Sequence, residues 1–416
     1  MKEPKIRFKG FKGEWENPTI ANTFAIRNGY TPSKAIKAFW DGGTIPWFRM
    51  EDIRENGGIL KDAIQHITPL GVKGDGLFET NSIILATTAT IGVHAMLIAD
   101  SLANQRFTNF SIRKSLKDNY NPMFVYYSFF GIDEWCKKNT NSGGLLAVNI
   151  PYLLKQSFHT PTLPEQQSIA SYFQHLDSLI QSTTKKIESL KQVKAASLQS
   201  MFPQEGETTP RVRFKGFEEE WEIVTLGEVG TFKSNGVDKL IKPNEKIINL
   251  LNYLDVYNSR QVTKDNCNSL MQVSASDRQI KECDIQKNDV FFTPSSETAE
   301  DIGYVLVMRD TLPNTCYSYH LMRYRPNEGV FFEDFPNCGF MTKFVRAQIR
   351  LLAKGVQRFV IGKTEFESIK VQIPSYKEQM QIANFFRSLD RQITLQTQRL
   401  EKLKQIKAAC LDNMFV

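Results

Sequence analysis

The sequence predicts an α+β fold in which two globular bodies of mixed helix and strand are separated by two long antiparallel helices. Three observations lead to this expectation. The chain has 416 residues, which is long for one domain and suits several compact units. Its two halves repeat one another at their ends, which predicts an internal pseudo-twofold relation. Each half closes with a long stretch free of glycine and internal proline, which predicts a coiled-coil-like helix pair.

The repeat is clearest in the segments that open the two halves. The sequence PKIRFKGFKGEWE, which begins at Pro4, returns as PRVRFKGFEEEWE beginning at Pro210. Similarly, PTLPEQQSIA at Pro161 matches PSYKEQMQIA at Pro374. Between these blocks the halves barely resemble each other. Preserved ends around divergent middles indicate a constant frame that presents two different binding surfaces.

These blocks divide the chain into four parts. Two are the bodies, which carry the divergent sequence, and two are the closing helices. The predicted parts are a first body at 1–160, a central helix segment at 161–205, a second body at 206–373 and a distal helix segment at 374–416.

The closing stretches are expected to be helices that pack against each other. Pro164 stands where a first-turn proline is tolerated, and Pro203 and Gly206 stop the first helix. Apolar residues recur at alternating steps of three and four, with Thr183 and Gln396 as polar interruptions that more often fix register than perform chemistry. An isolated amphipathic helix would leave its apolar stripe exposed, so the two stripes are expected to bury each other. The predicted helix–helix interface comprises Phe173, Leu176, Ile180, Ile187, Leu190, Phe386, Leu389, Ile393, Leu400 and Leu403.

The bodies, about residues 17–158 and 223–371, combine signals for strands, helices and glycine-rich turns such as Gly143-Gly144. Short apolar runs with β-branched and aromatic residues are typical of buried strands. The predicted buried strands are Ser82–Ala86 and Asp289–Phe292, and the predicted short helices are Tyr120–Trp135 and Phe340–Leu352.

Composition indicates an ordinary globular protein with an excess of basic residues. Hydrophobic residues make up 41% and charged residues 23%, with a formal net charge of +7. That charge suits a polyanionic partner, but equally a merely basic soluble protein. No apolar run reaches the ~20 residues that a membrane span needs. The six cysteines are scattered without metal-ligand spacing, so we expect no metal site and a cytoplasmic location.

The loops of both bodies place polar side chains suited to base edges beside basic ones. Arginine reads guanine, and asparagine or glutamine reads adenine, through paired hydrogen bonds. Lysine and backbone amides bind phosphate. Any one of these residues is more often an ordinary solvated loop residue, so the set is a hypothesis. The candidate DNA-binding residues are Thr87, Thr88, Thr90, Asn104, Gln105, Arg106, Ser295, Ser296, Gln357, Arg358 and Lys363.

Two segments come close to catalytic motifs without completing them. Asn121–Phe124, NPMF, resembles the Asn-Pro-Pro-Tyr/Phe loop of adenine methyltransferases, but it lacks the second proline and no glycine-rich cofactor loop precedes it. Gly362-Lys363-Thr364 resembles a phosphate-binding loop, but Gln357 stands where that motif needs glycine. We therefore expect no catalytic residues.

The repeated closing motif resembles that of the specificity (S) subunits of type I restriction-modification systems, and the resemblance spans essentially the whole chain. The motif stands as PEQQSIASYFQHLD from Pro164 to Asp177. It recurs from Tyr376 to Asp390, where Tyr376-Lys377 replaces the proline-rich start. Gly43–Phe48, GTIPWF, also resembles a recurrent segment of the family's recognition domains.

The resemblance implies that the bodies are target-recognition domains, each reading one half of a split double-stranded DNA target. The helices would set the gap between the halves and dock two methyltransferase (M) subunits. Those subunits would bind S-adenosylmethionine and methylate adenine, and ATP-driven restriction (R) subunits would join them. The chain itself would bind no cofactor and would not be an enzyme.

Alternatives from other classes remain open at this point. The chain could serve a type II-like system whose methylase and nuclease are fused in one partner. It could instead be a stand-alone DNA-modifying enzyme with an unrecognised site. A purely structural coiled-coil protein is disfavoured, because two dissimilar globular bodies would then lack a purpose.

Overall fold

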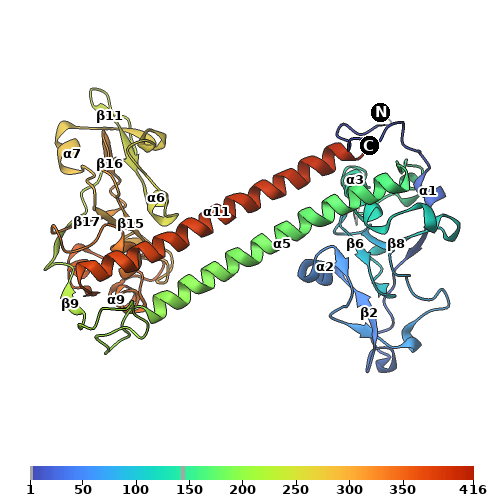
Figure 1. Ribbon diagram of the computed structural model, residues 1–416, viewed down its shortest axis with the longest axis horizontal. Helices are drawn as coiled ribbons and strands as arrows, with labels where there is room; N and C mark the ends of the chain where they lie inside the picture. The colour runs from blue at the N-terminus through green and yellow to red at the C-terminus, as the bar shows by residue number, and fades with distance from the viewer. Residues whose placement is uncertain (1–2, 142–145) are drawn as a thin grey trace. The chain divides into compact units, whose positions relative to one another are not determined.

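The computed structural model describes residues 3–141 and 146–416, so the turn expected at Gly143-Gly144 lies outside the described residues (Figure 1). The chain forms two compact units. The first comprises Met1–Thr184 and Gln398–Val416, and the second comprises Lys185–Thr397. Each unit therefore contains one body together with half of each long helix. Within the described residues, no helix combines the length and apolar character needed to cross a membrane.

The two long helices have the positions that the sequence predicts. Helix α5 spans Leu163–Ser200 and α11 spans Tyr376–Met414. Pro164 occupies the second position of α5, where no backbone donor is lost to the helix, and the rest of α5 contains neither proline nor glycine. The prediction of two long closing helices is confirmed.

In the first unit, the beginning of α5 packs antiparallel against the end of α11. The Lys407 ammonium donates a hydrogen bond to Asp177 Oδ1 at 2.5 Å. The rings of Phe173 and Phe415 lie 5.8 Å apart. Later residues of α5 therefore contact earlier residues of α11, so the two helices run antiparallel here. Leu176 and Met414 are buried in the same core.

The second unit repeats this packing with the roles of the helices exchanged. Here Lys194 of α5 donates to Asp390 of α11 at 2.5 Å, and these residues are the repeat counterparts of Lys407 and Asp177. Phe202 and Phe386 lie 6.1 Å apart. Among the predicted interface residues, Phe173, Leu176, Ile187, Phe386, Leu389 and Leu400 are buried, whereas Ile180, Leu190, Ile393 and Leu403 are half-buried.

The body of the first unit is built on two sheets. Its main sheet has the order β1 (Phe24–Asn28), β8 (Phe107–Ile112), β5 (Ile83–Ala86), β6 (His94–Leu97) and β3 (Ile59–Leu60). Its smaller sheet joins β4 (His66–Ile67), β2 (Ile45–Phe48) and β7 (Leu102–Ala103), with β2 parallel to β7. The helices are α1 (Ile20–Thr23), α2 (Met50–Asn56), α3 (Pro122–Lys138) and α4 (Ile150–Leu153).

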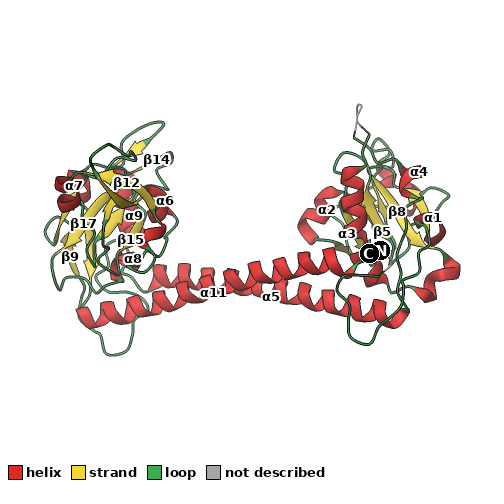
Figure 2. Cartoon of the chain, turned by 90° about the horizontal axis from the view of Figure 1, so that it is seen from above, coloured by secondary structure: helices red, strands yellow, loops and turns green. Residues whose placement is uncertain are grey.

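The second body (Figure 2) repeats the strand arrangement of the first despite its different sequence, but its main sheet has four strands where that of the first body has five. Its main sheet has the order β10 (Gly230–Lys233), β17 (Met322–Pro326), β13 (Val290–Phe292) and β15 (Val305–Val307). Its smaller sheet joins β12 (Met271–Ala275), β11 (Lys246–Leu251) and β16 (Thr315–Tyr317), with β11 parallel to β16. Two-stranded pairs link β9 (Glu222–Thr225) to β19 (Lys370–Ile373), and β14 (Ser295–Ser296) to β18 (Phe359–Val360). The helices are α6 (Tyr253–Tyr257), α7 (Asp277–Glu282), α8 (Phe335–Gly339), α9 (Lys343–Leu352) and α10 (Lys363–Glu367).

The main sheet of each body is buried on both faces, which explains the uninterrupted apolar runs. Ile83 and Leu85 of β5 face a core shared with the long helices, whereas Ile84 faces a separate outer core. In β13, Phe292 faces the inner core and Phe291 faces the outer one. A strand covered on both sides needs apolar residues at every position. The predicted strands and short helices are thus confirmed as β5, β13, α3 and α9.

In each half, an ion pair between the two repeated sequence blocks joins the opening segment to the start of the long helix that closes that half. Arg7 donates two hydrogen bonds to Glu165, at 2.7 and 2.8 Å, and Arg213 donates two to Glu378, both at 2.8 Å. Both carboxylates are almost fully buried. The amide of Gln166, next in the motif, donates to two backbone carbonyls and accepts from the Asn121 backbone N–H. The repeat therefore encodes the frame on which each body is mounted.

Candidate nucleic-acid interface

The two candidate loops of the first body begin at neighbouring strand ends. Ala86 pairs with Phe107 in the sheet, and the Thr87 backbone N–H donates to the Arg106 carbonyl at 3.0 Å. Thr87 itself is only 6% exposed, and its hydroxyl lies 3.0 Å from that of Thr108. The structure thus brings the loops together but places the Thr87 side chain inside the body.

The remaining candidates of the first body are at least partly accessible. Gln105 and Arg106 are exposed, and Asn104 is half-buried, with its side-chain oxygen accepting from the Arg106 backbone N–H at 3.0 Å. Thr88 forms a bridge with Ala147, on the segment that follows α3. The Thr90 backbone N–H donates to the Thr88 carbonyl at 2.9 Å.

Four of the five candidates in the second body line one cleft. Ser295, Ser296, Gln357 and Arg358 surround a hollow of about 690 Å³. Strand β14 brings the serines against β18, which follows Gln357 and Arg358 directly. Lys363 lies apart from this cleft at the start of α10, where it pairs with Glu367 at 3.5 Å.

The candidate sites occupy the same topological place in both bodies. Thr88 follows β5, and Ser295 follows the corresponding strand β13. Thr88 bridges to Ala147, and Ser295 pairs with Val360, each on the segment that follows a helix of the body. In both bodies, therefore, residues that follow a central strand pair with a segment that comes after a helix of the body, and the two sequences differ at this place.

The cleft also contains residues that sequence reasoning missed. Tyr253 and Tyr257 of α6 stack with ring centroids 5.9 Å apart, and the Tyr253 hydroxyl donates to the Ser295 carbonyl at 3.1 Å. Burial lowers the pKa of His320, and the positive charges of Lys239 and Arg358 lower it further. The spacing of the two tyrosines by four residues was the signal available in the sequence.

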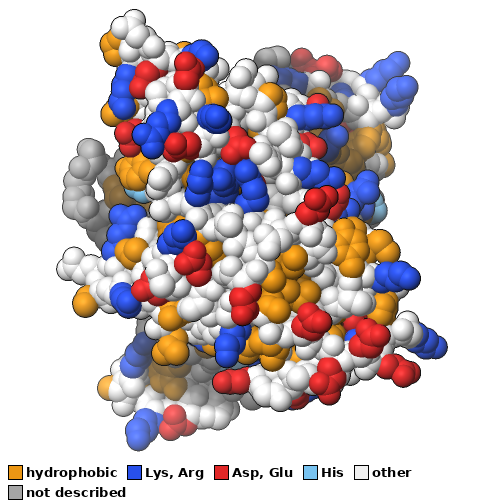
Figure 3. All heavy atoms as spheres, turned by 90° about the vertical axis from the view of Figure 1, so that its left-hand side faces the viewer, with side chains coloured by type: hydrophobic (Ala, Val, Ile, Leu, Met, Phe, Trp, Pro, Cys, Tyr) orange, Lys and Arg blue, Asp and Glu red, His pale blue; other side chains and the backbone are white. Residues whose placement is uncertain are grey.

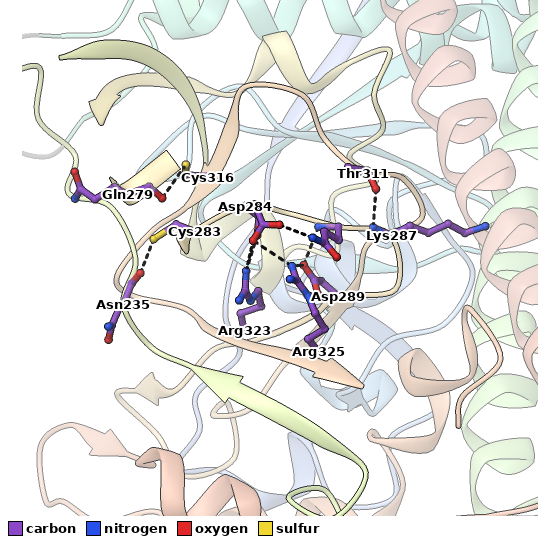
Figure 4. A network of polar contacts seen from close by, with 11 residues as sticks. Asn235, Gln279, Cys283, Asp284, Lys287, Asp289, Thr311, Cys316, Arg323 and Arg325 are labelled. Atoms are coloured by element: carbon purple, nitrogen blue, oxygen red, sulfur yellow. Dashed lines mark hydrogen bonds and ion pairs between the residues drawn. The ribbon is translucent and has the colours of Figure 1, made fainter. Parts of the chain in front are cut away.

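Other arginines of the second body are engaged in structural ion pairs (Figure 4). Arg325 donates to both oxygens of Asp289, at 2.6 and 2.7 Å, and Arg323 donates to Asp284 at 2.8 Å. Burial raises the pKa of the Asp289 carboxyl, although the hydrogen bonds from Arg325 act in the opposite direction. These guanidinium groups tie β17 to the segment that precedes β13.

Surface charge alone does not mark an interface on the face of the second unit that Figure 3 shows. The face shown in Figure 3 mixes Lys and Arg with Asp and Glu, with one group of basic side chains near its middle. Hydrogen-bond donors that have no intramolecular partner and lie in a cleft are therefore a better indication of a binding site than total charge.

Both near-catalytic motifs form the starts of helices. Asn121 is the N-cap of α3, and its side-chain oxygen accepts from the Phe124 backbone N–H at 3.0 Å. Gly362 occupies the corresponding position before α10. Within residues 3–141 and 146–416, no cluster of three His, Cys, Asp or Glu side chains could hold a metal ion.

Comparison with known proteins places these features in a family. The description "Type I restriction modification DNA specificity domain" matches residues 12–192 and again residues 218–405. The EcoprrI specificity subunit of Escherichia coli is 47% identical over 141 residues, which cover 34% of this chain and 35% of that relative. The MjaIX specificity subunit of Methanocaldococcus jannaschii is 27% identical over 246 residues, which cover 52% of this chain and 51% of that relative. The matches thus span about a third and about half of the lengths of these two relatives.

Solved structures share the whole fold at low sequence identity. The S subunit of a type I restriction-modification system from M. genitalium gives a TM-score of 0.58 at 15% identity, over 100% of this chain and 99% of that chain. A chain from a study of complex assembly and conformational transition of the type I system gives 0.56 at 13% identity, over 96% and 97%. With the specificity domain matched in both halves, the chain belongs to the family of type I restriction-modification DNA specificity domains.

Proposed function

We propose that the chain is the DNA-specificity subunit of a type I restriction-modification complex and that each body reads one half of a bipartite target. One observation carries this proposal. Two bodies of one topology are mounted on the same Arg–Glu frame, yet they present different side chains at the same topological place. Two recognition domains that differ in sequence but are attached to the helices in the same way suit a target made of two unrelated half-sites.

The chain supplies recognition, and its partners supply the chemistry. Methyltransferase subunits bind S-adenosylmethionine, and restriction subunits bind ATP, so the chain needs neither cofactor. In support, the side chain of Asn121, in the methyltransferase-like segment, caps the N-terminus of α3. The relatives named above are specificity subunits of type I enzymes, so neither a fused type II-like partner nor a stand-alone enzyme is favoured.

The long helices are the surfaces that suit two copies of one partner. Seven of the fourteen positions from Pro164 to Asp177 are identical in the second copy (Glu, Gln, Ile, Ala, Phe, Leu and Asp), and both copies use the glutamate in equivalent ion pairs. Two similar surfaces on one chain can bind two identical methyltransferase subunits, whereas the divergent bodies cannot. A soluble complex of this kind acts on DNA in the cytoplasm.

The test combines the purified chain with its methyltransferase partner. Alone, the chain should transfer no methyl group from labelled S-adenosylmethionine and should cut no DNA. With the partner, single-molecule sequencing of exposed DNA should find methylated adenines in one bipartite motif. Methyl transfer by the chain alone, or methylation by the partner at the same motif without the chain, would contradict the proposal.

A further inference from the structure

A short hairpin at residues 354–360, called the finger from here on, follows α9 in the second body. Lys354 and Val360 close it with two backbone hydrogen bonds of 3.0 and 2.9 Å. Gly355 has φ of +141°, and a Cβ there would lie 2.0 Å from the Arg358 carbonyl oxygen. Only glycine fits at this position without a backbone shift, so the turn of the finger requires Gly355.

The base of the finger is anchored while its tip is exposed. Phe359 and Val360 pair with Ser296 and Ser295. Next along the chain, Ile361 is 1% exposed within the inner core of the second unit. Val356 at the tip is 92% exposed. Its methyl groups are therefore accessible for contact with a ligand.

The two polar residues of the tip keep most of their hydrogen-bonding groups free. Arg358 Nη2 donates to Ser295 Oγ at 3.1 Å, which orients the guanidinium and leaves its other donors available. For Gln357, the described part of the chain provides no side-chain hydrogen-bond partner. By contrast, the neighbouring Lys354 donates to Glu365 at 2.7 Å.

We propose that the finger enters the major groove of the second half-site and that Arg358 reads a guanine there. This inference rests on the proposed function. The major groove is about 12 Å wide and accepts a two-stranded ribbon, and arginine binds guanine O6 and N7 through two parallel hydrogen bonds. Gln357 reads a neighbouring adenine, and Val356 packs against a thymine methyl group by the same chemistry. The single bond to Ser295 sets the direction from which the guanidinium approaches.

The experiment compares methylated motifs produced by the complex of the chain with its methyltransferase partner. Arg358→Lys keeps the positive charge but lacks the two-pronged guanidinium. We expect this variant to lose its preference for guanine at one position of one half-site by roughly ten- to hundredfold, the range for a paired contact. The other half-site should be unchanged. Arg278→Lys is the matched control, because Arg278 lies on α7, outside the finger and its cleft, and donates to Glu282 at 2.9 Å; it should leave the motif intact.

Each outcome bears on the inference separately from the proposed function. An unchanged motif in Arg358→Lys would overturn it, and so would uniform weakening without a relaxed position, which indicates a phosphate contact. If Arg358→Lys lowers the melting temperature, Gln357→Ala tests the same finger and should relax an adenine position; an unchanged motif there also overturns the inference. Failure of the unaltered chain to direct methylation to any motif would instead refute the proposed function.

Discussion

The ion pair between Arg213 and Glu378 offers a sharp test of the frame. In Arg213→Ala, the Glu378 carboxylate loses both of its 2.8 Å hydrogen bonds from the guanidinium. That carboxylate is 1% exposed, so without the guanidinium its charge is poorly solvated, whereas the arginine is 15% exposed. The hydrogen bond to Glu378 also raises the pKa of Arg213, as expected for a pair that favours the charged forms.

The magnitude follows from burial of the remaining charge. Removing one partner of a buried ion pair typically costs about 3–5 kcal/mol. Because the arginine is partly accessible, we expect the lower end, about 3 kcal/mol. For a unit of roughly 200 residues, 1 kcal/mol corresponds to about 2–4 °C, so the transition of the second unit should fall by about 6–12 °C.

Thermal unfolding of the full chain, followed by calorimetry, measures this shift. Arg211→Ala is the control, since Arg211 is 69% exposed and a surface ion pair such as the one with Glu207 contributes little to stability. Replacing both partners, as Arg213→Met with Glu378→Leu, should recover most of the stability because no charge is left buried. Equal shifts for Arg213→Ala and Arg211→Ala would refute the reasoning.

Three further predictions concern recognition. Replacing residues 17–158 by the first body of another family member should change one half of the methylated motif only, and motif sequencing that showed both halves altered would contradict divided recognition. Four-residue insertions near Lys185 and Gln398, one in each long helix, add about 6 Å and should widen the gap between half-sites by about one or two base pairs; a change in the bases read would count against this role. Arg358→Ala removes a positive charge that lowers the pKa of His320, so NMR titration should find that pKa closer to 6.5, and an unchanged value would show that the two groups do not interact.

Sequence patterns predicted the parts of the fold that depend on local periodicity. The long helices and the buried strands β5 and β13 follow from apolar spacing within one segment. The shared topology of the two bodies did not follow, because the parallel pairing of β11 with β16 joins segments far apart in a divergent sequence. That pairing places α6, which follows β11, near His320, which follows β16, and the pairing of β14 with β18 places the rest of the cleft.

The candidate site was predictable in residue type but not in accessibility. Ser295 and Arg358 were selected as hydrogen-bonding loop residues, and the structure brings them within 3.1 Å of each other. Thr87 was selected on the same grounds, but the neighbouring strand buries it against Thr108. Lys363 forms an ion pair with Glu367, one helical turn away, which competes with binding to phosphate. This pair can be predicted only once α10 is known.

The division of the two long helices between the units sets the order in which the protein can be completed on the ribosome. The second unit is one continuous stretch, whereas the first also needs Gln398–Val416. Met414, 3% exposed, fills part of the core around Phe173. At roughly 5–20 residues per second, the first body waits on the order of ten to forty seconds with that part of its core open. The body translated first is therefore completed last, and a truncation that removes Gln398–Val416 would leave the core of the first unit open.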